Sequence, residues 1–235
     1  MRDSIRAVAF DGYGTLIDFS VPRFLAVMEN LVRAHGVDAD PQALWERFVE
    51  AAKAVHGENY HDPVYRRYEE AWTLQFERAA RDLGFQGDGR LAAAHLKREL
   101  SEADAFAEVP AVLAALRGRY RLAVLSNADN DFLLACLARN GLEFEAVVTS
   151  EMAGAIKPDP RIFHHLAEVL GLPGEQILYV GDWPMPDIVG ARRAGVPVVW
   201  LNRGGHTLPP DMPAPDLEVA SLTELLPILV GPNSS

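Results

Sequence analysis

The chain has a single cysteine, few basic residues relative to acidic ones and no block of positive charge. Cys136 alone cannot form an intramolecular disulfide, and its apolar neighbours indicate a buried thiol. The formal net charge is -11 at pH 7, with 22 Lys and Arg against 33 Asp and Glu. Such a balance does not suit binding to nucleic acid or to an anionic membrane. We therefore expect neither partner.

Long hydrophobic runs are also missing. Charged residues at Arg2, Asp3 and Arg6 occupy the place where a signal peptide or spanning helix needs an apolar stretch. We therefore expect no signal peptide and no membrane span, and a cytoplasmic location. Of the 235 residues, 49% are hydrophobic, so the chain can bury a sizeable core. The sequence does not determine the oligomeric state.

The spacing of apolar residues changes along the chain. From Val21 to about Ala105 they recur three and four positions apart, which predicts amphipathic helices. From Val109 onward, helical stretches alternate with short apolar strands, which is typical of a parallel sheet. The strands are expected at residues 121–125, 146–149, 176–180 and 196–201.

A further strand, Ala7–Phe10, precedes the helical stretch and has the same character as the later strands. The helices therefore interrupt a sheet that the chain begins early and completes late. We predict an α/β protein with a Rossmann-like parallel sheet core, residues 1–18 and 106–235, and an inserted helical cap, residues 19–105.

The first strand leads directly into a carboxylate. Asp11 follows it, and Gly12, Gly14 and Thr15 come next. Parallel sheets collect ligands at the carboxyl ends of their strands, and glycines let the backbone bend around an anion. A carboxylate held there can attack phosphorus or carbon. By itself the motif is equally consistent with a strand followed by an ordinary turn.

Two later segments present polar side chains in similar positions. Ser126 follows an apolar strand and can donate a hydrogen bond to an anion, while Asn127 can bind a ligand, orient a side chain or cap a helix. Lys157 precedes Pro158 in a rigid turn before a helix expected over 161–170. It would neutralise charge shared by a phosphate and carboxylates, although a lysine before proline is more often a surface residue.

Two more carboxylates follow another predicted strand. Asp182 lies just beyond it, and Asp187 precedes a helix expected over 188–194. Mg²⁺ binds about six oxygens, which Asp11, Asp182, a backbone carbonyl, a phosphate oxygen and waters would supply. Asp187 would then hold a metal-bound water or Lys157. Helix capping would explain Asp187 but not Asp182, so a metal site is favoured.

Taken in order, these segments resemble the signature of the haloacid dehalogenase superfamily of hydrolases, including its phosphatases with an all-helical cap. The resemblance covers nearly the whole chain. It implies a hydrolase acting on a small-molecule substrate, with Mg²⁺ as cofactor in the phosphatases. The matching segments are Asp11 with Gly14-Thr15-Leu16, Ser126-Asn127, Lys157-Pro158, and Gly181-Asp182 with Asp187.

The resemblance also implies residue roles. It gives the nucleophile as Asp11, the phosphate donor as Ser126, the charge clamp as Lys157, a magnesium ligand as Asp182, and the residue that orients the loop as Thr15. Tyr13 would contribute its backbone carbonyl to the metal. Trp183 lies in the active-site loop, and we expect it to contact the substrate together with Tyr13 and Gly14.

Tyr13 departs from the phosphatase pattern, which usually carries a second aspartate at this position as general acid and base. A phenol with a pKa of about 10 is a poor base at neutral pH, and lost acid–base help costs a factor of roughly 10² to 10⁴. The dehalogenase branch has tyrosine here, because halide leaves without a proton. A dehalogenase also needs a cap arginine for the substrate carboxylate, and the candidates are Arg23, Arg66 and Arg67.

Asp182 and Asp187 resemble the metal site of the phosphatases, whereas the dehalogenases work without metal. We therefore predict a Mg²⁺-dependent phosphohydrolase that forms an aspartyl-phosphate on a small phosphorylated metabolite and favours good leaving groups. One alternative is a metal-independent 2-haloacid dehalogenase that forms an ester on Asp11. Another is a catalytically weak protein that binds a small phosphorylated ligand.

Overall fold

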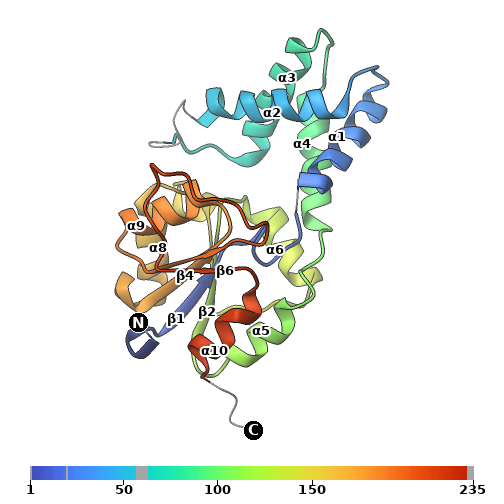
Figure 1. Ribbon diagram of the computed structural model, residues 1–235. Coiled ribbons are helices and arrows are strands. Elements are labelled where there is room, and N and C mark those ends of the chain that lie inside the picture. Colours follow the sequence, from blue (N-terminus) through green and yellow to red (C-terminus); the bar gives the residue numbers. More distant parts are fainter. Residues whose placement is uncertain (1, 20, 57–62, 232–235) are drawn as a thin grey trace.

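The computed structural model describes residues 2–19, 21–56 and 63–231. At its centre lies a six-stranded parallel sheet with the order β3-β2-β1-β4-β5-β6 (Figure 1). The strands are β1 (Ala7–Phe10), β2 (Arg121–Ser126), β3 (Ala146–Thr149), β4 (Ile177–Gly181), β5 (Val198–Leu201) and β6 (Leu217–Val219). Phe10 in β1 lies opposite Val124 in β2 and Val180 in β4. The residues that follow these strands therefore meet at one edge of the sheet.

The predicted α/β class with a parallel sheet is confirmed. β1 and β3 have the predicted bounds, β2 and β5 differ by one or two residues at one end, and β4 is shifted by one residue at both ends. The edge strand β6 was not predicted, because it has three residues and a single buried one, Val219. The helix expected over 188–194 was wrong in part, since the π-helical turn η3 (Pro184–Val189) precedes the short helix α9 (Gly190–Arg193).

Helices cover both faces of the sheet, because alternate strand side chains point to opposite sides. Val8 and Phe10 belong to one hydrophobic core, and Ala7 and Ala9 to the other. The first core includes residues of α5 (Val109–Leu116), α6 (Asn130–Arg139) and α10 (Leu225–Leu229). The second includes residues of α8 (Pro160–Leu170) and α9, and α7 (Ser150–Ala153) lies between β3 and α8.

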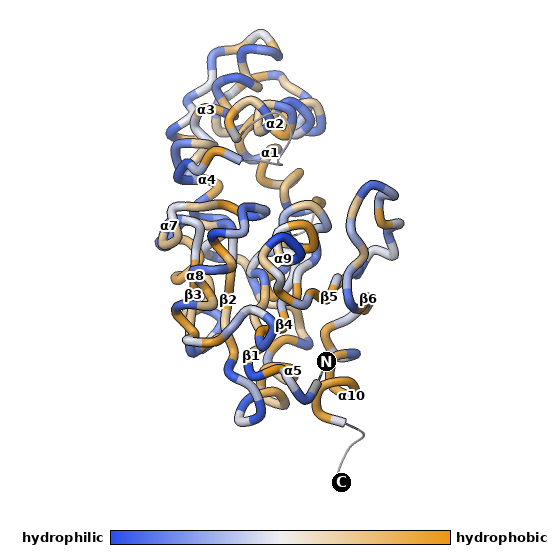
Figure 2. Tube along the Cα trace, turned by 90° about the vertical axis from the view of Figure 1, so that its left-hand side faces the viewer, coloured by the Kyte–Doolittle hydropathy of each residue, from blue (hydrophilic) through white to orange (hydrophobic). Residues whose placement is uncertain are grey.

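Between β1 and α5 the described part of the chain forms α1 (Val21–His35), α2 (Pro41–His56), α3 (Tyr68–Asp82) and α4 (Gly89–Ser101). They form a separate group on one side of the sheet in both views (Figures 1 and 2). In α3, Trp72, Phe76, Ala79 and Ala80 are buried, at the three- and four-residue spacing of an amphipathic helix. We call this group the cap, and its bounds at residues 19–105 stay a prediction.

Two chain segments join the cap to the sheet, and they lie side by side. The Asp18 amide donates to the Asp104 carbonyl at 2.9 Å, and the Phe106 amide donates to the Leu16 carbonyl at 3.0 Å. The cap thus leaves and rejoins the rest of the molecule next to the loop that follows β1. Across the described part of the chain, each helix is too short or too polar to cross a membrane.

Candidate active site

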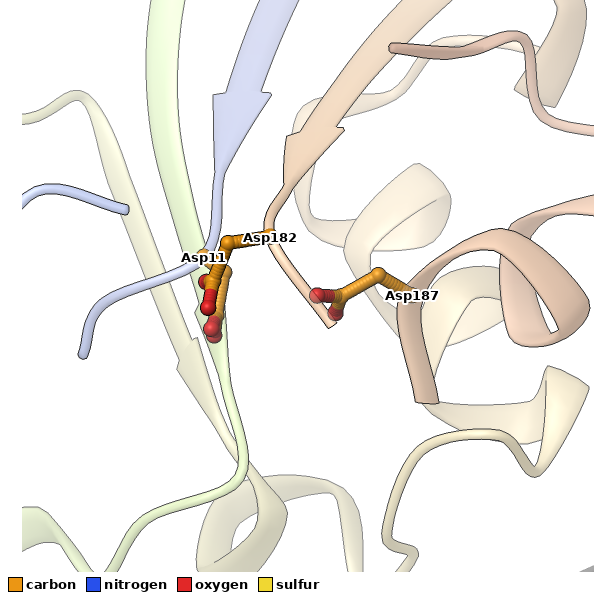
Figure 3. Close-up of side chains that lie close together, drawn as sticks. All are labelled: Asp11, Asp182 and Asp187. Atoms are coloured by element: carbon orange, nitrogen blue, oxygen red, sulfur yellow. The ribbon is translucent and has the colours of Figure 1, made fainter. Parts of the chain in front are cut away.

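The ends of β1 and β4 bring three carboxylates together. Asp11 follows β1, Asp182 follows β4, and Asp187 lies in η3. The carboxylates of Asp11 and Asp182 lie side by side, and that of Asp187 points toward them (Figure 3). One oxygen of each lies within 4.8 Å of the others. These are the three acidic residues that the sequence analysis placed at the predicted metal site.

The loop after Asp11 is tightly folded. The amides of Leu16 and Ile17 donate to the Gly12 carbonyl at 2.8 and 2.9 Å. Gly14 has a φ of +91°, and a Cβ there would collide with the Asp182 carboxylate. A side chain at this position is therefore excluded both by backbone conformation and by the carboxylate. Gly14, which we expected to contact the substrate, lies against Asp182.

Lys157 is buried among these carboxylates, so the alternative of a surface lysine was wrong. Its Nζ donates at 2.7 Å to Asp11 Oδ1, at 2.7 Å to Asp187 Oδ1 and at 2.8 Å to the Tyr179 hydroxyl. The side chain is 2% exposed. Burial by itself lowers the pKa of this ammonium, but the charges of Asp11 and Asp187 outweigh burial and raise the pKa. Lys157 therefore stays charged at neutral pH.

Asp187 holds Lys157, which is one of the three roles considered from the sequence. Its Oδ1 accepts hydrogen bonds from Lys157 and from the Tyr179 hydroxyl at 2.9 Å, and its Oδ2 accepts one from the Trp183 amide at 2.9 Å. It does not cap α9, so the capping alternative was wrong. Sequence reasoning missed Tyr179. It lies in the buried strand β4, where its phenol is the one polar side-chain group.

Asp182 is held by the loop that follows β1. The Thr15 hydroxyl donates to Asp182 Oδ1 at 2.7 Å. Burial, together with the charges of Asp11 and Asp187, raises the pKa of Asp182 to about 8. Burial also raises the pKa of Asp11, with the charge of Lys157 opposing and that of Asp187 adding to the change. Three carboxylates face one lysine, and this excess of negative charge favours a bound proton or cation.

Asn127 clamps the backbone next to Lys157. Its Oδ1 accepts from the Lys157 amide at 2.7 Å, and its Nδ2 donates to the Lys157 carbonyl at 3.2 Å. It thus orients the lysine loop and does not cap α6, whose cap position is Asp129. Ser126 is buried at the end of β2, and its hydroxyl lies beside Gly12. The serine therefore lies next to the loop that follows β1, and its role as phosphate donor stays a prediction.

Tyr13 points away from the carboxylates. Its hydroxyl donates to the Leu100 carbonyl at 3.2 Å and to the Phe132 carbonyl at 3.4 Å. Burial raises the pKa of the phenol above its usual value of 10. The phenol is therefore an ineffective acid or base at neutral pH. Trp183, the other aromatic candidate, has 65% of its surface exposed.

The three candidate arginines are all engaged within the protein. Arg23 donates to the Asp18 carbonyl at 2.8 Å, and Arg66 pairs with Glu70 at 2.7 Å. Arg67 lies 3.4 Å from Glu151, which follows β3. These contacts use the guanidinium groups that a carboxylate substrate would need.

The cap also contacts the sheet edge beside the site. Asp129, which follows β2, accepts hydrogen bonds from the amides of Tyr68 at 2.9 Å and Glu69 at 3.2 Å, at the start of α3. A carboxylate at a helix amino terminus is stabilised by the unpaired amides and the helix dipole. The first turn of a cap helix is thus attached directly to a loop at the site.

Comparison with known proteins supports a hydrolase. Residues 5–195 match a protein family described as "Hydrolase: haloacid dehalogenase-like hydrolase". The chain is 35% identical over 238 residues to a phosphoserine phosphatase of Thermus thermophilus, covering 89% of this chain and 93% of that protein. It is 31% identical over 226 residues to an (S)-2-haloacid dehalogenase of Pseudomonas sp. strain YL, covering 94% and 92%.

A solved structure has the same fold. The L-2-haloacid dehalogenase from Xanthobacter autotrophicus superposes with a TM-score of 0.78 over 97% of this chain and 100% of that chain, at 22% identity. The relatives therefore include both phosphatases and dehalogenases.

Proposed function

The chain belongs to the haloacid dehalogenase-like hydrolases, and from this premise we propose that it is a Mg²⁺-dependent phosphohydrolase that forms an aspartyl-phosphate on Asp11. Its substrate is a small phosphorylated metabolite with a good leaving group. The cap, residues 19–105, covers the site and selects the substrate.

The charge balance of the site is the observation that carries this proposal. Asp11, Asp182 and Asp187 bring carboxylate oxygens within 4.8 Å of one another, and Lys157 supplies a single positive charge among them. Carboxylate oxygens are the ligands that Mg²⁺ prefers, so the residues fit this ion. Asp187 already accepts three hydrogen bonds. When bound, the ion would be held by Asp11, Asp182 and the Tyr13 backbone carbonyl, and Asp187 would hold Lys157 or a metal-bound water.

The proposed reaction begins with attack of Asp11 on phosphorus. Lys157 holds Asp11 Oδ1 at 2.7 Å, so Oδ2 is the oxygen that forms the new bond and the leaving group departs with the electrons of the broken P–O bond. Ser126 donates to a phosphoryl oxygen. Water then hydrolyses the aspartyl-phosphate, which releases phosphate and restores the carboxylate. Bound Mg²⁺ supplies neutralisation of charge on the phosphoryl oxygens.

Tyr13 sets the substrate preference. It stands where phosphatases of this family carry an acid, but its hydroxyl is bound to the Leu100 carbonyl and burial raises its pKa. A leaving group that needs protonation therefore departs slowly. Aryl and acyl phosphates, whose leaving groups are weak bases, are the substrates that this site favours.

Dehalogenation of a short 2-haloacid is the second candidate, because Tyr13 and the haloacid dehalogenase relatives favour it. Asp11 would attack carbon and expel halide without proton transfer. The arrangement of the arginines speaks against it. Arg66 and Arg67 already pair with carboxylates of the protein, so a substrate carboxylate would have to displace these protein carboxylates from the arginines.

The test is hydrolysis of p-nitrophenyl phosphate and acetyl phosphate at neutral pH, with Mg²⁺ or with EDTA. Asp11→Asn is the inactive variant, and Asp88→Asn is the matched control, because Asp88 caps α4 on the exposed cap surface. Turnover that needs both Mg²⁺ and Asp11 supports the proposal. Asp11-dependent halide release from 2-chloropropionate in EDTA would favour the dehalogenase, and tight phosphate binding without turnover a binding protein.

A further inference from the structure

Arg203 connects three parts of the molecule that surround the active site. It follows β5, and its Nη2 donates to the Thr15 carbonyl at 3.1 Å. Its Nη1 lies 2.5 Å from Glu108 Oε1, and its guanidinium carbon lies 3.8 Å from the centre of the Phe106 ring. Arg203 and Glu108 are 25% and 21% exposed, so solvent screens this pair only in part. The guanidinium therefore has three partners in a largely desolvated place.

Thr15 is therefore held through both its backbone carbonyl and its side-chain hydroxyl. Its carbonyl accepts from Arg203, and its hydroxyl donates to Asp182 Oδ1 at 2.7 Å. The residue is fully buried. A change in the position of the Thr15 backbone therefore moves the hydroxyl relative to the Asp182 carboxylate. Arg203 contacts none of the three carboxylates in the contacts described above, so its influence on them runs through Thr15.

The other partners of Arg203 lie where the chain returns from the cap. Phe106 donates its amide to the Leu16 carbonyl at 3.0 Å, and Glu108 directly precedes α5. The backbone next to Arg203 is anchored, because Asn202 donates its amide to the Val219 carbonyl at 2.7 Å. The loop after β5 is thus a fixed point from which the guanidinium reaches the loop after β1.

We propose that Arg203 is a positioning residue for the active site. It holds the Thr15 carbonyl so that the Thr15 hydroxyl stays on Asp182, and through Glu108 and Phe106 it ties this loop to the segment that returns from the cap. The planar guanidinium serves the carbonyl, the carboxylate and the ring at once, which a lysine ammonium cannot do. The effect on Mg²⁺ binding rests on the proposed function, whereas the effect on the loop does not.

The test compares Arg203→Lys with Arg121→Lys. Arg121 also pairs with a carboxylate, that of Glu145, and donates to the Leu170 carbonyl. It lies at the start of β2, at the end of the strand away from the active site. Hydrogen exchange measured by mass spectrometry on the metal-free protein reports the loop directly. We expect amides within residues 11–18 to exchange about tenfold faster in Arg203→Lys and unchanged in Arg121→Lys. Glu108→Gln should give a smaller change in the same segment, and it replaces Arg203→Lys if that variant does not fold.

Calorimetric titration with Mg²⁺ separates positioning from a general structural role. We expect Arg203→Lys to weaken Mg²⁺ binding by about tenfold, and to add almost nothing in a Thr15→Val background, because both changes remove the same contact to Asp182. Unchanged exchange in residues 11–18, or additive effects of the two substitutions, would overturn the proposal. If the unaltered protein binds no Mg²⁺, the proposed metal site fails, and hydrogen exchange alone decides the role of Arg203.

Discussion

Replacing Asp182 with asparagine should stabilise the metal-free protein above pH 4 and remove its response to Mg²⁺. In the folded protein the pKa of Asp182 is raised from 3.8 to about 8, chiefly by burial and then by the charges of Asp11 and Asp187. Between these two values the folded state binds more protons than the unfolded state. Stability therefore falls as pH rises through this window, and an asparagine, which does not titrate, escapes the loss.

The size of the effect follows from the shift. Each pKa unit corresponds to about 1.4 kcal/mol, so this carboxyl lowers the free energy of unfolding by about 4 kcal/mol between pH 4 and pH 7. The loss is about 5 kcal/mol at pH 8, where the carboxyl is half ionised in the folded state, and levels off near about 6 kcal/mol above that pH. Asp182 lies beside two other carboxylates and is partly exposed, so solvent reduces this cost in part and the figures above are its upper end.

The assay is urea denaturation in EDTA at pH 5, 6, 7 and 8. The difference in unfolding free energy between Asp182→Asn and the unaltered protein should grow by about 1.4 kcal/mol per pH unit up to pH 7 and more slowly from pH 7 to pH 8. Saturating Mg²⁺ should stabilise the unaltered protein and leave the variant almost unchanged. Asp88→Asn is the control, because asparagine caps a helix as well as aspartate does.

A difference that stays constant between pH 5 and pH 8 would refute the reasoning. It would mean that Asp182 titrates near its ordinary value in the folded state, so the site would carry no excess charge that needs a cation. The excess of negative charge, which is the main support for the metal site, would then be lost.

Three further changes test other parts of the site. Lys157→Met leaves Asp11 and Asp187 buried without a cation, so we expect urea denaturation to show a loss of about 3–5 kcal/mol and hydrolysis to fall at least about 100-fold. Tyr13→Asp restores an acid, and should raise the ratio of alkyl to aryl phosphate turnover by about 10² in kcat/KM, whereas Tyr13→Phe should leave that ratio unchanged. Gly14→Ala should weaken Mg²⁺ binding in calorimetry, because the methyl group displaces Asp182. The control is Gly36→Ala, since Gly36 also has a positive φ, +62°, but has open space around it. A matching loss of Mg²⁺ binding in Gly36→Ala would contradict this explanation.

Local patterns were sufficient for the sheet and for the strand-end residues. The apolar runs before Asp11, Ser126 and Asp182 are continuous, as buried parallel strands require, and parallel strands place their carboxyl ends together. The edge strand β6 escaped detection because one buried residue leaves no periodicity. The turn η3 escaped because its two prolines and π-helical geometry differ from an ordinary helix start.

Partners that lie far apart in the chain could not be predicted in this way. From the sequence, Asp187 could hold a metal-bound water, pair with Lys157 or cap a helix, and the structure shows the pairing with Lys157, 30 residues away. It also shows Tyr179 beside that pair and Arg203 bound to Thr15 across 188 residues. No local spacing encodes such contacts, since they depend on which loops the fold brings together.

The sequence by itself determined the class of sheet, the inserted helices, the acidic residues at the strand ends and the family signature, because these depend on periodicity and on the order of short motifs. Tertiary structure decided the hydrogen-bond partners of each carboxylate, the direction of the Tyr13 phenol and the excess of negative charge around Lys157. Those properties depend on distance and burial, which are set when loops distant in sequence meet at one edge of the sheet.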